Sequence, residues 1–127
     1  MPVDPGLATL LESDPERRDR DWERVLSWLS RRFGPVESLE AVLFIVGLQE
    51  SGRGYEPQLT KEQKQELIME GTYAALAEVG VCERTSDEDG HAMWSRRIDT
   101  RRLTSDEQAT LLRIGLVRNL TRYVPEG

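Results

Sequence analysis

A chain of 127 residues with 38% apolar and 31% charged side chains can bury one core and needs no second domain. Its 23 acidic residues outnumber 17 basic ones, and the net charge of -6 disfavours binding to nucleic acid or to anionic lipid surfaces. A single cysteine excludes an internal disulfide framework. The N-terminal MPVDPG lacks a basic and an apolar leader region, and the longest apolar run, residues 41–46, is far below the ~20 residues that cross a bilayer. We therefore expect a soluble cytoplasmic protein.

The first third of the chain predicts two helices. Residues 7–12 fit a short helix, which needs support from the core because six residues cannot hold a helix alone. Over residues 21–33 the apolar side chains recur at the spacing of one helical face; they are Trp22, Val25, Leu26, Leu29 and Phe33. Ser13 or Asp14, followed by Pro15, offers an N-cap for an earlier start of this second helix.

Three further helices are predicted around one loop. Residues 36–50 form the most hydrophobic stretch, and their length favours a buried helix over a buried strand. The segment SGRGYEPQL at 51–59 is typical of a loop. Residues 60–79 open with TKEQ, a capping-box match, and place apolar residues on one face. A second match, Thr104 with Glu107, opens the last helix.

The segment between the last two helices does not fit a helix. VCERT and HAMWSRRI are short mixed stretches separated by SDEDG, and the Asp-Gly step is a strong hairpin-turn signal. We predict a two-stranded ribbon at roughly 81–85 and 91–97. Because an isolated ribbon is marginally stable in water, Val81, Met93 or Trp94 must pack on a helix.

These elements predict a mainly α fold of four to five helices in one domain, residues 1–127, with a small β-hairpin at about 81–97 before the last helix. Residues 1–20 are expected to include a loosely packed N-terminal arm. The order helix, then ribbon also fits a winged-helix-like arrangement, with residues 60–79 as recognition helix and the ribbon as wing.

The charges disfavour the winged-helix hypothesis of a nucleic-acid-binding regulator. Phosphates would meet a mixed, net-negative face on the candidate recognition helix, which carries Lys61, Glu62, Lys64, Glu66, Glu70 and Glu78. Fifteen of the 17 basic residues are arginines. This excess of arginine over lysine can reflect genomic base composition or a salty habitat, or it can mark an arginine-lined contact surface. A basic patch requires that four arginine pairs meet on one side of the fold: Arg17-Arg18, Arg31-Arg32, Arg96-Arg97 and Arg101-Arg102. Solvated helix ends and local salt bridges are the commoner explanation.

A metal-dependent enzyme is the third hypothesis. It requires Cys82 and His91 to converge with a carboxylate from Asp87, Glu88 or Asp89, yet no CxxC or HxxxH spacing accompanies them. A catalytic Cys-His pair needs an activated thiolate, whereas Cys82 follows the C-terminal end of a helix, where the dipole disfavours one. We therefore expect no metal and no cofactor, with Cys82 as a small core residue and His91 near solvent at the start of a strand.

The hypothesis that the sequence favours over these two is a protein-interaction function. In this hypothesis the chain is a small acidic interaction or adaptor module without catalytic activity, and it binds another protein or itself as a homodimer. Trp28 lies about 120° from Trp22 around its helix and is a candidate exposed aromatic beside Arg31 and Arg32. Tryptophan and arginine dominate the binding energy of protein interfaces. The predicted contact residues are Trp28, Arg31 and Arg32 on the helix, and Trp94 and Arg96 on the hairpin.

Overall fold

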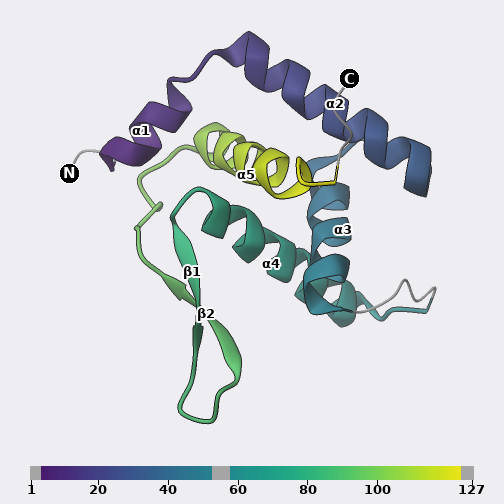
Figure 1. Cartoon of the computed structure of the whole chain (residues 1–127), viewed down its shortest axis with the longest axis vertical. Helices are drawn as coiled ribbons and strands as arrows, with labels where there is room; N and C mark the ends of the chain where they lie inside the picture. Colours follow the sequence, from purple (N-terminus) through teal and green to yellow (C-terminus); the bar gives the residue numbers. More distant parts are fainter. Residues whose placement is uncertain (1–3, 53–57, 124–127) are drawn as a thin grey trace.

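The computed structural model describes residues 4–52 and 58–123, which form five helices and one β-hairpin (Figure 1). The helices are α1 (Pro5–Leu11), α2 (Pro15–Phe33), α3 (Leu39–Ser51), α4 (Lys61–Glu78) and α5 (Ser105–Leu120), and the strands β1 (Cys82–Ser86) and β2 (Ala92–Arg96) lie between α4 and α5. This order confirms the predicted mainly α fold with a hairpin before the last helix. Most of the predicted loop at 51–59 lies outside the described residues.

The predicted start signals operate at the helix ends. Asp14 caps α2, and its carboxylate accepts from the Glu16 amide at 3.0 Å. Thr60 and Gln63 form a reciprocal capping box at the start of α4, with bonds of 3.1 and 2.8 Å between side chain and backbone. Thr104 begins α5 in the same way. Each cap satisfies amides that have no partner inside the first turn of the helix.

Helices α3, α4 and α5 approach one another through glycines. A Cβ atom at Gly47 of α3 would overlap the carbonyl oxygen of Leu67 in α4, and one at Gly71 of α4 would overlap that of Leu43 in α3. Gly115 brings α5 against the backbone of α4 in the same way. Because no side chain separates these backbones, the three helices form the closely packed centre of the molecule.

Within the described residues, nearly all buried apolar side chains belong to two groups. The larger group contains residues from α2, α3, α4 and α5. It consists of Val25, Leu29, Val36, Val42, Leu43, Val46, Ala74, Ala75, Leu116 and Leu120. The smaller lies among α1, the end of α4, the base of the hairpin and α5, and consists of Leu7, Leu76, Val79, Val81, Cys82, Leu103 and Leu111. Among the described residues, no helix is both long and apolar enough to cross a membrane.

Helix α2 lies across the other helices, and its C-terminal end extends past α3 (Figure 1). Helix α1 is attached to the same side of the fold through Leu7, which is fully buried. The hairpin extends away from the helices (Figure 1), with Cys82 paired to Arg96 at its base and Ser86 to Ala92 near its tip. The two ends of α2 and the hairpin are therefore three separate surfaces.

Candidate functional site

The last turn of α2 carries three of the predicted contact residues. The guanidinium of Arg32 lies 4.6 Å from the centroid of the Trp28 ring, and Arg31 donates from Nε to the carbonyl oxygen of Ser27 at 3.4 Å. Trp28 is half-buried and packs on the larger core cluster, whereas both arginines are exposed. We call Arg31, Arg32 and Phe33, with Trp28 beneath them, the α2-end surface.

The prediction that Phe33 belongs to the buried face of this helix is wrong. Its side chain is 60% exposed, the largest exposure among the large hydrophobic residues that the structure describes. The helical spacing does point Phe33 to the same side as Leu29, which is fully buried. The helix, however, extends past α3 at this point, so no other described helix or strand covers its last turn (Figure 1).

Trp94, the predicted contact residue of the hairpin, is held by contacts within the chain. Its ring stacks on Tyr73 of α4 with centroids 5.9 Å apart, and its Nε1 donates to a carboxylate oxygen of Glu70 at 3.2 Å. On the other side, the guanidinium of Arg84 lies 5.1 Å from the ring centroid. Arg96 is exposed and donates to the hydroxyl of Thr100 at 2.9 Å. Trp94 thus attaches the hairpin to α4, as the marginal stability of a lone ribbon requires.

Cys82 and His91 do not come together. Cys82 lies at the base of the hairpin, opposite Arg96, while His91 lies beyond the last strand pair at the tip. Four residues of strand separate the base from the tip, or about 13 Å. Burial raises the pKa of the Cys82 thiol, and Arg96 opposes this shift more weakly. The buried, protonated thiol is the opposite of an activated nucleophile.

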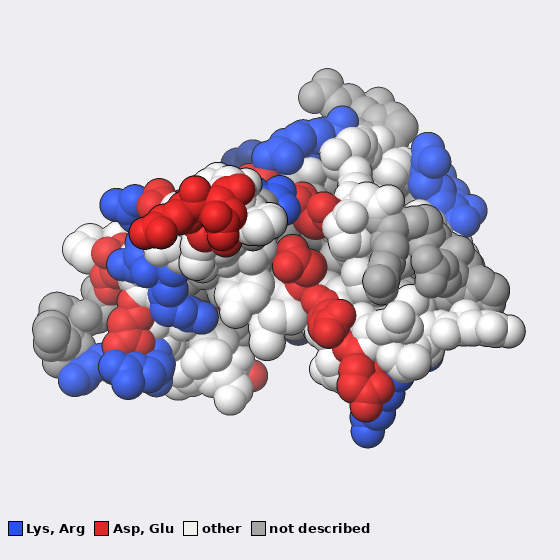
Figure 2. Space-filling model, turned by 90° about the horizontal axis from the view of Figure 1, so that it is seen from below, with Lys and Arg blue, Asp and Glu red and all other residues white. Residues whose placement is uncertain are grey.

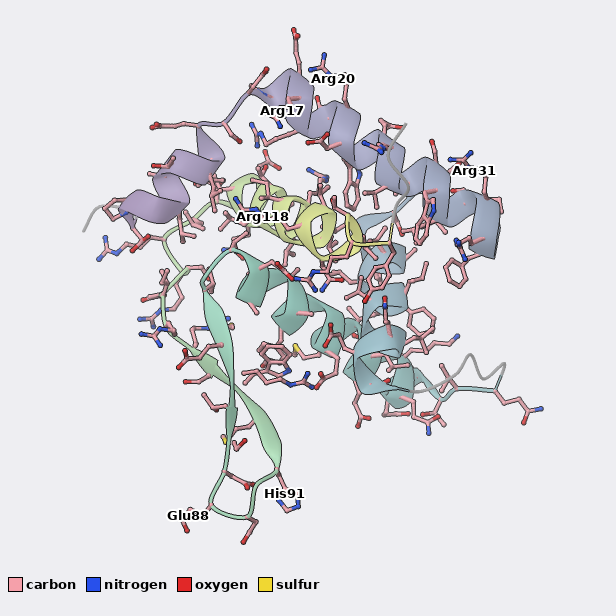
Figure 3. All side chains as sticks on the ribbon, in the orientation of Figure 1. Arg17, Arg20, Arg31, Glu88, His91 and Arg118 are labelled. Carbon is pink, nitrogen blue, oxygen red and sulfur yellow. The ribbon has the colours of Figure 1, made fainter. Side chains whose placement is uncertain are left out.

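The hairpin tip gathers Asp87, Asp89 and His91, whose potential ligand atoms lie within 4.8 Å of one another, all on exposed residues. The hydrogen bonds give these residues a structural role. One oxygen of Asp87 accepts from the amides of Asp89 and His91 at 2.9 and 2.8 Å, and the other lies 3.3 Å from the His91 ring nitrogen Nδ1. Gly90, at φ 83°, donates to the Asp87 carbonyl and closes the turn. Figure 3 shows His91 and Glu88 at this solvated end of the molecule.

The four arginine pairs do not form one basic patch. Arg17-Arg18 and Arg31-Arg32 lie at opposite ends of α2, about 21 Å apart along the helix axis. Arg97 is paired with Glu83 at 2.6 Å and Arg101 with Asp99 at 2.9 Å. The Arg101 guanidinium lowers the pKa of Asp99 to about 2.

Acidic residues cover the face that the winged-helix hypothesis assigns to nucleic acid. Glu62, Glu66 and Glu70 recur every four residues on α4 and therefore share one side of that helix. Figure 2 shows acidic side chains in a row across the middle of the face seen from below, and in a second group over the hairpin. This distribution counts against a recognition helix with a basic wing, because phosphates would be repelled.

A hollow of about 490 Å³ lies where α1 and α2 meet α5. Four arginines line it, Arg17 and Arg18 from the first turns of α2 and Arg113 and Arg118 from α5. Its other polar and apolar lining residues include Asp14, Asp19, Asp21, Trp22, Leu10, Ile114 and Val117. Figure 3 shows Arg17 on the side of α2 that faces α5, whereas Arg20 points away from it.

The arginines of this hollow differ in their partners: Arg118 donates to the carbonyl oxygen of Glu78 at 3.1 Å, and the guanidinium of Arg113 lies 6.0 Å from the centroid of the Trp22 ring. Within residues 4–52 and 58–123, the ion pairs closer than 4.0 Å include none between these arginines and the aspartates beside them. The Nε atom of Arg18 is buried and has no hydrogen-bond partner, alone among the buried side-chain nitrogen and oxygen atoms of the described chain. Leaving such a donor unpaired costs about 1–3 kcal/mol. An acceptor in the hollow would remove this cost only if the Arg18 side chain turned, because its Nε has almost no accessible surface.

No protein-family model matches this chain, and no curated protein or solved structure shows significant similarity to it.

Sequence reasoning identified the Arg17-Arg18 pair but not the hollow. The pair is a local signal, whereas its partners Arg113 and Arg118 lie about a hundred residues later in the sequence. Their five-residue spacing does not mark a site, since exposed arginines on an amphipathic helix ordinarily face solvent. Only the packing of α2 across α5 brings the two sets together.

Proposed function

We propose that this chain is a cytoplasmic protein-interaction module, rather than an enzyme, and that the α2-end surface binds an acidic segment of a partner protein. The observation that carries the proposal is the exposure of Phe33 beside two arginines, one of them stacked on Trp28. Aromatic residues and arginine are enriched in the centres of protein interfaces, where lysine and the acidic residues are depleted.

The arginines favour an acidic partner. Arg31 and Arg32 are exposed, and neither forms an ion pair with any residue in the described part of the chain. The cation-π contact with Trp28 limits the motion of the Arg32 side chain, so less conformational entropy is lost when it binds a carboxylate. Phe33 then supplies an apolar anchor next to the charges.

The hairpin is the weaker of the two predicted contact surfaces. Trp94 is already engaged by Tyr73, Glu70 and Arg84, so its ring offers little free area to a partner. The proposal therefore gives Arg96 and the hairpin a secondary contact at most.

Site-specific crosslinking tests the proposal. A photo-reactive benzoylphenylalanine at Phe33, introduced in the native cell, is expected to give a discrete adduct whose captured segment is rich in Asp and Glu. The same probe at Met69 of α4, which is 53% exposed, is the matched control and should not give that adduct. The double charge reversal Arg31→Glu and Arg32→Glu should abolish the adduct at Phe33.

Three outcomes would overturn the proposal. The first is an adduct that forms equally from Phe33 and Met69, and the second is one that survives the charge reversal. In the third, the captured segment belongs to a second copy of this chain and light scattering shows a dimer that Phe33→Ser dissociates. That result would make the surface a homodimer interface and not an adaptor site.

A further inference from the structure

The hollow at the N-terminal end of α2 is a second site, about 20 Å along the helix from the α2-end surface. We propose that it binds a small organic molecule carrying carboxylate or phosphate groups. The inference does not rest on the proposed function, because none of the residues that line the hollow belongs to the α2-end surface.

The charge of the hollow favours an anion. Four arginines and three aspartates line it, in a chain whose net charge is -6. One aspartate, Asp14, is already committed, since its carboxylate caps α2 through the Glu16 amide. The four guanidinium groups exceed the three carboxylates by one charge, and they come from two helices, α2 and α5. Arginine forms paired, charge-assisted hydrogen bonds with carboxylate and phosphate oxygens.

The buried Nε of Arg18 marks the point where an acceptor is missing. Arg18 is half-buried, and its Nε is buried without a hydrogen-bond partner. Buried polar groups in folded proteins are almost always paired. Asp19 and Asp21 line the same hollow but lie beyond ion-pair distance of this group. A bound anion would supply this acceptor once the Arg18 side chain turned its buried Nε toward the hollow.

The remaining wall favours an organic anion over a bare inorganic ion. Trp22 lines the hollow, with the guanidinium of Arg113 6.0 Å from its ring centroid, and the apolar side chains of Leu10, Ile114 and Val117 complete the wall. A volume of about 490 Å³ is far larger than one phosphate and lies in the range typical of small-molecule sites. The site thus offers guanidinium groups to the charged end of a ligand and an apolar wall to its body.

Calorimetric titration at fixed ionic strength tests this inference. Phenyl phosphate and phthalate serve as the phosphate and carboxylate probes, and phenol serves as the neutral control. We expect saturable binding of one or both anions and none of phenol. The tighter of the two anions identifies the chemical group that the site prefers.

Three variants assign the binding to the hollow. Arg18→Gln should weaken it by about tenfold or more, because a charge-assisted hydrogen bond is lost. Arg113→Gln, on the exposed opposite rim, should weaken it as well and guards against a folding defect caused by the partly buried Arg18. Arg20→Gln removes the same charge from the outer side of α2 and should leave the affinity within about twofold.

The absence of saturable binding by both anions would overturn the inference. So would equal weakening by Arg20→Gln and Arg18→Gln, which would show a diffuse charge effect. The double variant Arg31→Glu and Arg32→Glu should bind the anions in the hollow as tightly as the unmodified chain does. The two proposals can therefore fail separately: loss of the adaptor proposal would not affect anion binding, and absence of anion binding would not affect the adaptor proposal.

Discussion

Helix α4 makes two contacts of opposite kinds. It meets α3 backbone to backbone, because Gly71 and Gly47 leave no side chain between the two helices. Beyond the backbone bond from the Val81 amide to the Leu76 carbonyl at its base, it meets the hairpin through side chains, with Tyr73 stacked on Trp94 and Glu70 bonded to the indole nitrogen. At the glycine crossings the first contact has no side chain that can rotate away, whereas the stacked and bonded groups of the second can rotate or shift.

This difference separates the part of the fold that must be rigid from the part that can tolerate change. An atom added at a backbone crossing forces two helices apart and disturbs every residue packed between them. A side chain removed from the hairpin contact leaves α4 in place and loosens only the ribbon. Substitutions in the two regions should therefore differ in the size and in the extent of their effects.

Gly71→Ala should produce the largest loss of stability. In a helix interior, alanine is ordinarily better than glycine by about 1 kcal/mol. Here its Cβ would overlap the Leu43 carbonyl oxygen, which is backbone and cannot rotate away. We expect the free energy of unfolding to fall by at least about 3 kcal/mol, measured by urea denaturation.

Ser27→Ala provides the control for that experiment, since Ser27 is exposed within α2 and its loss should change stability by less than about 0.5 kcal/mol. If Gly71→Ala instead unfolds at the same urea concentration as the unmodified chain, α3 and α4 do not cross as closely as described.

Trp94→Ala should have an intermediate and local effect. The substitution removes the stacking on Tyr73 and the bond to Glu70, but the indole is only half-buried. We expect a loss of about 2 kcal/mol, below the range for a fully buried tryptophan. Hydrogen exchange should accelerate in β1 and β2 while the amides of α3 and α5 stay protected. Met93→Ala, at the neighbouring and 48% exposed position, should leave that exchange unchanged. Faster hydrogen exchange throughout α3 would contradict the expectation that loss of the Trp94 contact loosens only the hairpin.

Local chemistry explains which features the sequence predicts well. Asp14, Thr60 and Thr104 cap their helices through bonds to residues two or three positions away, so the signal and its effect lie in the same short stretch. The Asp-Gly turn is equally local, with Gly90 in the left-handed conformation that its place in the hairpin requires. These patterns were sufficient to predict the helices, the ribbon and their order.

Features that depend on how helices cross were not predictable in this way. Phe33 obeys the helical spacing of a core residue, yet it is exposed because α2 continues past its neighbours. The arginine-lined hollow joins residues from α2 and α5 that lie about a hundred positions apart. Trp28 was predicted to be exposed and Trp94 to contact a helix or a partner, whereas both are half-buried with an arginine over the ring. These features depend on how segments distant in the sequence pack together, and a single sequence carries no signal for that packing.

The smallest effect should come from the hairpin tip, where backbone conformation acts without crowding. Gly90 has φ 83°, and a Cβ atom there would meet nothing within 4 Å. Gly90→Val should still cost about 1–2 kcal/mol, because a β-branched residue is strained in this left-handed region. Gly71 and Gly90 thus illustrate two different reasons why a position requires glycine. At Gly71 the reason is the close approach of another backbone, and at Gly90 it is the backbone conformation.

His91→Ala is the matched control for Gly90→Val, since it removes an exposed side chain next to the turn but keeps the amide that donates to Asp87. We expect a change within about 0.5 kcal/mol and no change in partner binding. A loss of binding or a large loss of stability in His91→Ala would show that the tip of the hairpin has a role beyond the turn. The cluster of Asp87, Asp89 and His91 would then need to be tested directly by titration with zinc.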